Sequence, residues 1–272
     1  MKQDFRIFLD FSRRLWTNRF MLKMMTDREL KAQYVGSLFG LAWAVINPLA
    51  LMAVYGIVFG YFFKTKPDPS SGTQSYMLYL VCGLIPWQFF AQTVTSCADA
   101  LTKNSNLIKK AVDFPSEILP VVTVFSSVIS HLIGVAVLLI LTVIFNGSLS
   151  PWTLVIFVYI FFIVVLTVGL GWILSSLSVY LKDLKQVLGL VIMAGFFFTP
   201  IFYPASRIPA AVLWIFKLNP MFHVVEGYRL TMLAGRPPVV NGLIYLAVVS
   251  VVTFAMGGIF FRRLKPGFAE VL

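Results

Sequence analysis

Six long apolar stretches, separated by short polar connections, dominate the sequence. They fall at residues 36–63, 76–98, 119–145, 151–181, 186–203 and 241–261. A helix needs about 20 mainly apolar residues to cross roughly 30 Å of hydrocarbon, so each stretch predicts a membrane-spanning helix. The fifth stretch is the weakest, because Gly195 and the Thr199-Pro200 pair interrupt it.

A shorter apolar piece at 208–218 follows the fifth stretch. It is too short to span, and Pro209 and Asn219-Pro220 bracket it. We interpret it as a re-entrant or interfacial segment, although an arrangement with seven spans stays open. The sequence therefore predicts an all-α membrane protein with six transmembrane helices, in which residues 1–35 form a cytoplasmic entry segment and 36–272 the transmembrane domain.

The composition supports a membrane protein. Hydrophobic residues make up 59% of the chain and charged residues only 12%, whereas a soluble domain has roughly 25% charged residues. The two cysteines, Cys82 and Cys97, cannot build a disulfide scaffold, and we expect both to be small core residues. In a soluble domain a net charge of +11 would suggest binding to nucleic acid. Here the positions of the Lys and Arg residues follow the predicted membrane topology.

Lys and Arg are distributed unevenly between the two sides of the predicted bundle. With both termini inside, the inner segments (1–35, 99–118, 182–185 and 262–272) hold 16 of the 22 Lys and Arg residues. Short cytoplasmic segments of membrane proteins carry such an excess. The count predicts that both termini are cytoplasmic. A seventh span would weaken this asymmetry, because it would move the C-terminal Lys and Arg residues to the outer side. The first span begins after a long basic segment, and we expect no cleavable signal peptide.

The basic N-terminal segment from Phe5 to Phe20 has an amphipathic pattern. Arg6, Arg13 and Arg14 gather on a narrow stripe, while aromatic and aliphatic residues cover most of the remaining surface. Such a helix lies in the headgroup plane of a membrane; a soluble helix packed on a partner is the alternative. Residues 27–34 have mixed charge, and we expect them to turn the chain into the membrane.

The chain carries no recognisable catalytic or nucleotide-binding motif. There is no phosphate-binding glycine loop, and His131 and His223 have no acidic partners at metal-ligand or hydrolase spacing. We therefore expect no enzymatic activity and no bound cofactor or metal. His131 lies in a span, where an interhelical hydrogen bond is the favoured interpretation. The near absence of ionisable residues in the spans disfavours an ion-coupled carrier.

Aromatic residues are frequent in the predicted spans. Most would face lipid or the membrane interface, but aromatic rings can also stack on the C–H faces of sugars, so some could line a path for a glycan. The candidates for lining a channel are Trp43, Tyr55, Phe59, Trp87, Phe90, Trp172 and Phe197.

Five segments of the chain have a distinctive sequence: ELKAQYVGSLFGLAWAVINPL (29–49), NSNLIKKAVDFPSEILPV (104–121), FFFTPIFYPASRIP (196–209), LNPMFHVVEGYR (218–229) and the terminal FAEVL. They resemble the permease subunits of ABC transporters that export bacterial polysaccharides, the type 2 ABC permeases. They cover the chain from the entry segment to its end in the order typical of that family. Within the family, the sequence is most similar to the O-antigen exporters.

The resemblance implies a homodimer in the bacterial inner membrane that works with two copies of a separate ABC ATP-binding subunit. ATP and Mg would be used by that partner, and none would be bound by this chain. The substrate would be a polysaccharide linked to undecaprenyl diphosphate, moved from cytoplasm to periplasm. Membrane lipids are further expected partners, and nucleic acid is not.

The resemblance also gives roles to two connections. The loop between the second and third spans would be a coupling helix that docks on the ATPase, with Lys103, Leu107, Ile108, Lys109, Lys110, Asp113 and Glu117 as its contact residues. The insertion from 204 to 235 would form short periplasmic gate helices, at 208–216 and 222–233. The gate candidates are Ile208, Trp214, Glu226 and Arg229, and the last two have the spacing of a helical ion pair.

A diphosphate head group would need cationic donors at the cytoplasmic entrance. Arg28, Lys31 and Tyr34 are the candidates, although the two cations could equally be positive-inside anchors. Export of capsular polysaccharide, of teichoic acid, or of a drug or small lipid is the alternative function. A membrane-embedded polyprenyl-diphosphate transferase is a third possibility, but it would need an acidic metal-binding cluster, and the outer segments hold only Asp68 and Glu226.

Overall fold

The computed structural model describes residues 17–34, 39–110 and 114–272, and within these ranges the chain is helical without any strand. The elements in chain order are α2 (Arg19–Tyr34), η1 (Gly40–Ala42), α3 (Trp43–Tyr55), η2 (Gly56–Phe62), η3 (Pro69–Ser71), α4 (Tyr76–Ala98), α5 (Ala100–Lys103), α6 (Ser105–Lys110), α7 (Ile118–Asn146), η4 (Pro151–Val155), α8 (Ile156–Tyr180), α9 (Leu184–Phe197), η5 (Ala205–Arg207), α10 (Ala210–Lys217), α11 (Pro220–Tyr228), η6 (Arg229–Leu233), α12 (Val240–Leu264), η7 (Lys265–Gly267) and α13 (Phe268–Val271).

Five helical segments in the described part of the chain are long and apolar enough to cross a membrane. They are Val45–Phe62, Tyr76–Ala98, Ile118–Asn146, Pro151–Tyr180 and Val240–Gly267, and they correspond to five of the six predicted spans. The predicted span at 186–203 contains α9, an apolar helix of 14 residues. It is about 21 Å long at 1.5 Å per residue, shorter than the hydrocarbon core, so the sixth span stays a prediction.

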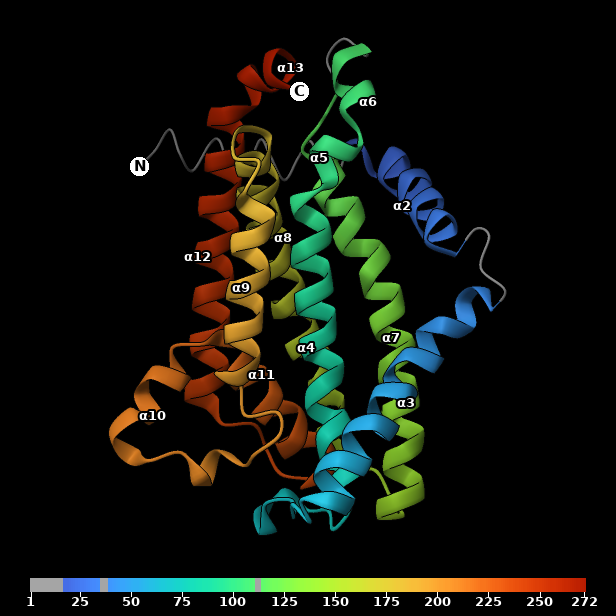
Figure 1. Ribbon diagram of the computed structural model, residues 1–272, viewed down its shortest axis with the longest axis vertical. Helices are drawn as coiled ribbons and strands as arrows, with labels where there is room; N and C mark the ends of the chain where they lie inside the picture. The colour runs from blue at the N-terminus through green and yellow to red at the C-terminus, as the bar shows by residue number, and fades with distance from the viewer. Residues whose placement is uncertain (1–16, 35–38, 111–113) are drawn as a thin grey trace.

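Helix α4 is the centre of the bundle. In its membrane-length window 72% of the residues are buried, against 6% for the segment Val45–Phe62, and it packs between α7, α8, α3 and α9 (Figure 1). The two cysteines of α4, Cys82 and Cys97, are free and buried, as expected for core residues. The α3 segment leaves most of its apolar surface uncovered by this chain, so that surface is available to lipid or to another subunit.

Helices α8 and α12 approach each other closely because two glycines meet at their crossing. A Cβ atom added at Gly257 would lie 2.3 Å from the carbonyl oxygen of Gly169, and one added at Gly169 would lie 2.6 Å from the backbone of Thr253. Only a residue without a side chain fits here. Small residues at helix crossings of this kind are a common way to pack membrane helices.

The connections separate into two ends of the bundle (Figure 1). The α6 end holds α5, α6, α13 and the C-terminus, and the α10 end holds η3, α10 and α11. At the α6 end the carboxylate of Glu117 binds Lys265 Nζ at 2.6 Å. The second connection and the C-terminal segment thus lie on the same side of the bundle.

Helix α2 and the short helices after α9 differ in how well they match the predictions. Residues 27–34, expected to turn the chain, instead form the second half of α2, because the run from Arg28 to Lys31 consists of residues with high helix propensity. The short helices predicted at 208–216 and 222–233 are present as α10, and as α11 continued by η6. The predicted interfacial helix from Phe5 to Phe20 falls almost entirely outside the described residues.

Candidate functional site

A polar groove of about 560 Å³ lies between α2, α3, α4 and α7. Its polar side chains are Gln33, Asn47, Gln88, Gln92, Thr93, Thr95, Ser96, Ser127, Ser130 and His131. Its other walls are Trp43, Ile85, Phe89, Ala91 and Gly134. None of these described lining residues is an aspartate, glutamate, lysine or arginine, so the groove is rich in hydrogen-bonding groups and carries no fixed charge.

Helical periodicity brings these side chains to one place. On α4, Gln88, Gln92 and Ser96 follow one another at intervals of four residues, which puts them on one face. On α7, Ser127, His131 and Gly134 form a matching stripe. Polar side chains inside membrane helices are rare and usually face a partner helix or an aqueous path. The helical spacing of both stripes is visible in the sequence, but the sequence-based predictions considered charged and aromatic residues and did not include them.

His131 connects the groove to the α10 end. Its Nε2 atom lies 2.9 Å from the hydroxyl oxygen of Tyr228 on α11, and its ring lies over Phe89 at 4.7 Å between centroids. The interhelical hydrogen bond expected for this histidine is therefore present. The other ring nitrogen, Nδ1, is buried and has no hydrogen-bond partner among the described residues.

The predicted channel-lining aromatics take three different positions. Trp43 lines the groove. Tyr55, Phe59, Trp87, Phe90 and Phe197 do not; they join an aromatic cluster through Phe196 and Phe202, with neighbouring ring centroids 4.7 to 6.3 Å apart. Trp172 has no exposed surface, and its indole N–H donates to the carbonyl oxygen of Glu117 at 3.0 Å. This hydrogen bond gives Trp172 a packing role within the subunit.

The head-group candidates lie on α2. Arg28 and Lys31 are exposed, and the side chain of Tyr34 is outside the described part. Gln33, on the same helix, lines the groove and donates to Ser126 Oγ at 3.4 Å. The last turns of α2 therefore lie at one margin of the groove, with their two cations exposed.

The coupling-loop candidates lie at the α6 end. Lys103 pairs with Glu29 of α2 at 3.1 Å, Leu107 and Ile108 are partly exposed and Lys109 is exposed. Asp113 and the side chain of Lys110 fall outside the described residues. Glu117 was expected at the rim of a docking surface, but its side chain is buried and bound to Lys265. It therefore holds α7 to the C-terminal segment instead of being presented to a partner.

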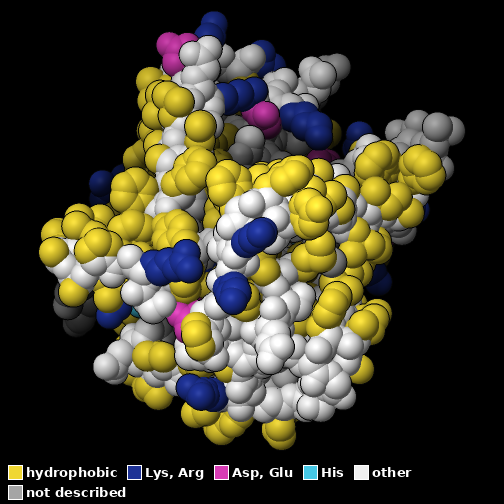
Figure 2. Space-filling model, turned by 60° about the horizontal axis from the view of Figure 1, so that its bottom comes forward, with side chains coloured by type: hydrophobic (Ala, Val, Ile, Leu, Met, Phe, Trp, Pro, Cys, Tyr) yellow, Lys and Arg dark blue, Asp and Glu magenta, His cyan; other side chains and the backbone are white. Residues whose placement is uncertain are grey.

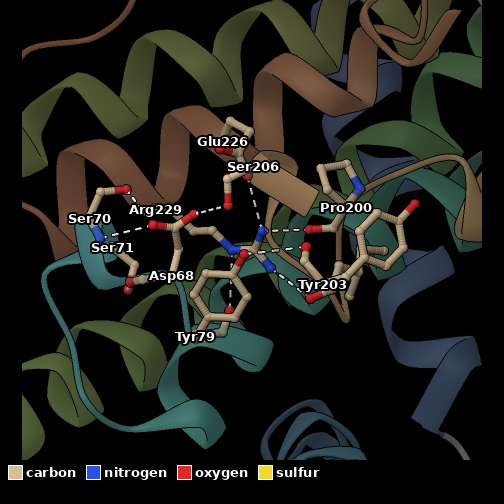
Figure 3. Close-up of polar contacts among 10 residues, drawn as sticks. Asp68, Ser70, Ser71, Tyr79, Pro200, Tyr203, Ser206, Glu226 and Arg229 are labelled. Atoms are coloured by element: carbon tan, nitrogen blue, oxygen red, sulfur yellow. Dashed lines mark hydrogen bonds and ion pairs between the residues drawn. The ribbon is translucent and has the colours of Figure 1, made fainter. Parts of the chain in front are cut away.

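A buried arginine organises the α10 end (Figure 3). Arg229 donates to the carbonyl oxygens of Tyr79, Pro200 and Ile201, and its Nη1 lies 3.1 Å from Glu226 Oε1. Its guanidinium carbon also lies 3.6 Å from the centroid of the Tyr79 ring. The expected pair of Glu226 and Arg229 is present, but Arg229 is buried while Glu226 is partly exposed.

Asp68 adds a second set of contacts to this end. Its carboxylate accepts a hydrogen bond from Ser206 Oγ at 2.6 Å and from the backbone N–H of Ser70 at 2.9 Å. The hydrogen bond from Ser206, with smaller contributions from Ser70, holds the pKa of Asp68 below its usual value. We call Asp68, Tyr79, Ser206, Glu226 and Arg229 the outer cluster. It joins the 64–75 connection, the start of α4, the 198–208 segment and α11.

The other two gate candidates differ in exposure. Ile208 is buried, whereas Trp214 on α10 is 62% exposed. Figure 2, which brings this end of the molecule forward, shows broad hydrophobic patches with lysine and arginine side chains set apart from one another. An exposed apolar helix such as α10 suits the interface of a membrane.

The sequence matches a family model described as ABC-2 type transporter over residues 21–233. The O-antigen export system permease protein RfbA of Klebsiella pneumoniae is 30% identical over 257 residues, which cover 93% of this chain and 95% of that protein. The protein of the same name from Myxococcus xanthus is 30% identical over 261 residues, 95% of this chain and 97% of its own length. The polysialic acid transport protein KpsM of Escherichia coli is 26% identical over 250 residues, 86% and 90% of the two chains. The family match covers well over half of the sequence, and the chain therefore belongs to the ABC-2 type transporter family.

Proposed function

We propose that this chain is the membrane subunit of an ATP-driven exporter that moves polysaccharide linked to undecaprenyl diphosphate, of the O-antigen type, from the cytoplasm to the periplasm. Its similarity to permeases named for O-antigen export supports this substrate class. The observation that carries the proposal is the uncharged polar groove between α2, α3, α4 and α7. Amide and hydroxyl side chains supply the donors and acceptors that sugar hydroxyls require in an otherwise apolar surrounding.

The chain would work as a homodimer with two copies of an ABC ATP-binding subunit, which the family implies. The exposed α3 segment next to the groove supports contact with a second copy. The α6 end and both termini would face the cytoplasm, with α9 as the sixth span. The ATPase, which would use ATP and Mg, would dock on α5 and α6, where Leu107, Ile108 and Lys109 are partly or fully exposed.

Substrate would enter beside α2 and leave past the α10 end. Arg28 and Lys31 would bind the diphosphate at the groove margin. The outer cluster would hold α10 and α11 closed over the exit in the absence of substrate. Replacing both Arg28 and Lys31 by Gln should then reduce export while membrane insertion stays normal, and normal export would reject the head-group assignment.

The function is tested by changing the groove. In a strain that lacks the chromosomal gene, the chain with Gln88 and Gln92 both replaced by Leu should fail to restore surface polysaccharide. Gln186, an exposed residue at the start of α9, gives the matched control, since Gln186→Leu adds the same apolar group away from the groove. Full export by the double variant, or equal loss in the control, would contradict transport through the groove.

Dependence on the ATPase is tested separately. In vesicles, the permease should move glycan only together with its ATP-binding subunit, and charge reversal at Lys109 and Lys110 should uncouple ATP turnover from export. Transport by the permease alone, driven by an ion gradient, would overturn the proposal. Capsule export is the second candidate, favoured by the similarity to KpsM, and analysis of the accumulated glycan in the deletion strain separates the two.

A further inference from the structure

Two buried polar atoms in the wall of the groove have no hydrogen-bond partner among the described residues. They are Oγ1 of Thr93 on α4 and Nδ1 of His131 on α7. Thr93 has no exposed surface and His131 is 5% exposed, and both residues line the groove. Buried polar groups are almost always paired, because an unpaired group loses its hydration without compensation. Each atom therefore lacks a partner that a hydrogen-bonding group of a ligand in the groove could supply.

The hydrogen-bonding capacity of the two atoms is best matched by a hydroxyl group of the ligand. If Tyr228 donates its hydroxyl proton to His131 Nε2, then Nδ1 carries a proton and is a donor; in the other tautomer Nδ1 is an acceptor. Thr93 Oγ1 can both donate and accept. A hydroxyl group, which also does both, is complementary to Thr93 and to either tautomer of His131.

The other residues that line the groove disfavour a charged ligand. No lysine or arginine lines it in the described part of the chain, so a carboxylate that entered would lose hydration without a cationic partner. Phe89 lies over the imidazole at 4.7 Å and Trp43 lines the same groove, which adds apolar surface for the C–H face of a sugar ring. The lining thus fits an uncharged chain rich in hydroxyl groups.

We propose that Thr93 and His131 form a hydroxyl-binding subsite that favours neutral over acidic polysaccharide. This inference rests on the proposed function, because it names the class of glycan that the groove accepts. It places the choice between neutral and anionic chains in the membrane subunit itself. It also predicts a difference from transporters of an acidic polymer such as polysialic acid.

The chain offers a matched pair of substitutions for a test. Thr153, in the η4 turn, is also buried with an Oγ1 atom that has no partner in the described structure, but it does not line the groove. Thr93→Val and Thr153→Val are isosteric, and each removes an unpaired hydroxyl, so each should leave thermal stability unchanged or raise it. Only Thr93→Val should weaken glycan binding, by about three- to tenfold for one hydrogen bond. A loss of stability in Thr93→Val would show that its hydroxyl is already paired and would overturn the inference.

Binding is measured on the complete complex with its ATPase in lipid nanodiscs, using the fluorescence of the tryptophans, of which Trp43 lies in the groove. The probes are a neutral mannose oligomer and a sialic acid oligomer of equal length. The mannose oligomer should bind at least about tenfold more tightly, as expected when a charge must be buried without a partner. The subsite would be rejected by equal affinities for the two oligomers or by no binding of either. It would also be rejected if Thr93→Val and Thr153→Val had equal effects on binding.

The export assay keeps this test distinct from the proposed function. If the unmodified chain restores no surface polysaccharide in the deletion strain, the proposed function itself fails. If export is restored but the Thr93→Val and Thr153→Val variants behave alike, export stands and only the hydroxyl-binding subsite is rejected.

Discussion

Arg229 and its ion-pair partner Glu226 should respond very differently to substitution. Arg229→Met keeps a long side chain but removes the donors to the carbonyl oxygens of Tyr79, Pro200 and Ile201. Each buried carbonyl oxygen that loses its donor costs about 1 to 3 kcal/mol, so the loss of three contacts should cost at least about 3 kcal/mol. The Glu226 side chain is 37% exposed, so Glu226→Gln removes a solvent-screened pair worth about 0 to 1 kcal/mol.

The two buried cysteines of α4 provide the assay. Cys82 precedes Gly83, where an added Cβ would lie 2.9 Å from Arg229 Nη2, whereas Cys97 lies near the other end of the helix. Each thiol is labelled by a maleimide dye in the background where the other cysteine is Ala. Since 1.4 kcal/mol is a factor of ten, Arg229→Met should speed Cys82 labelling by at least about 140-fold, with a smaller effect at Cys97. The ratio of the Cys82 and Cys97 labelling rates reports how far the helix opens locally near Arg229.

Glu226→Gln should change Cys82 labelling by less than about fivefold. Arg229→Lys keeps the charge but loses the planar fork, so its effect should fall between the other two. Equal effects of Arg229→Met and Glu226→Gln would show that the carbonyl contacts contribute little. An unchanged labelling rate in Arg229→Met would refute the reasoning altogether.

Three further outcomes are expected. Gly257→Ala should lower the melting temperature, because its methyl group meets backbone in α8 and overpacking costs about 1 to 3 kcal/mol. Gly189→Ala places its methyl group in open space and should not lower the melting temperature. Equal effects of the two substitutions would contradict the tight crossing of α8 and α12. Asp68 has a lowered pKa, so its stabilising effect is complete above the usual carboxyl pKa and is lost as the pH falls through the folded value. The Ser206→Ala variant should lose less stability on acidification, as measured by melting curves from about pH 6 to about pH 3, and an unchanged profile would reject this assignment. Lys103→Gln removes an exposed ion pair and should change stability by no more than about 1 kcal/mol in the same melts, so a larger loss would show that α5 depends on it.

Hydropathy predicted most of the fold because lipid-facing helices must be apolar along their whole length. The boundaries of α4 agree with the predicted span, and α7 and α12 agree within a few residues. The pattern gave the length of α9 less well. The predicted span runs to residue 203 although the Thr199-Pro200 pair interrupts it, because both residues are uncharged and do not end the apolar stretch. Proline cannot continue a helix, and α9 ends at Phe197.

The site was only partly predictable, for a different reason. The spacing of Glu226 and Arg229 gave the ion pair, since it depends on one helix alone. The contacts of Arg229 with Pro200 and Tyr79 join residues 29 and 150 positions apart in the sequence, which no local pattern encodes. Aromatic composition likewise could not separate Trp43, at the groove, from Trp172, in the core, because both occur in equally apolar surroundings.

The groove and the outer cluster meet at two consecutive residues of the chain. Tyr228 contacts His131 in the groove wall, and Arg229 binds the carbonyl oxygens of the 198–208 segment. Neighbouring positions on a helix point about 100° apart, so the end of α11 can contact both regions at once. Any movement of α11 away from the bundle must break both sets of contacts. Opening at this end therefore costs free energy, which in the proposed exporter would come from substrate binding in the groove and from ATP hydrolysis by the partner subunit.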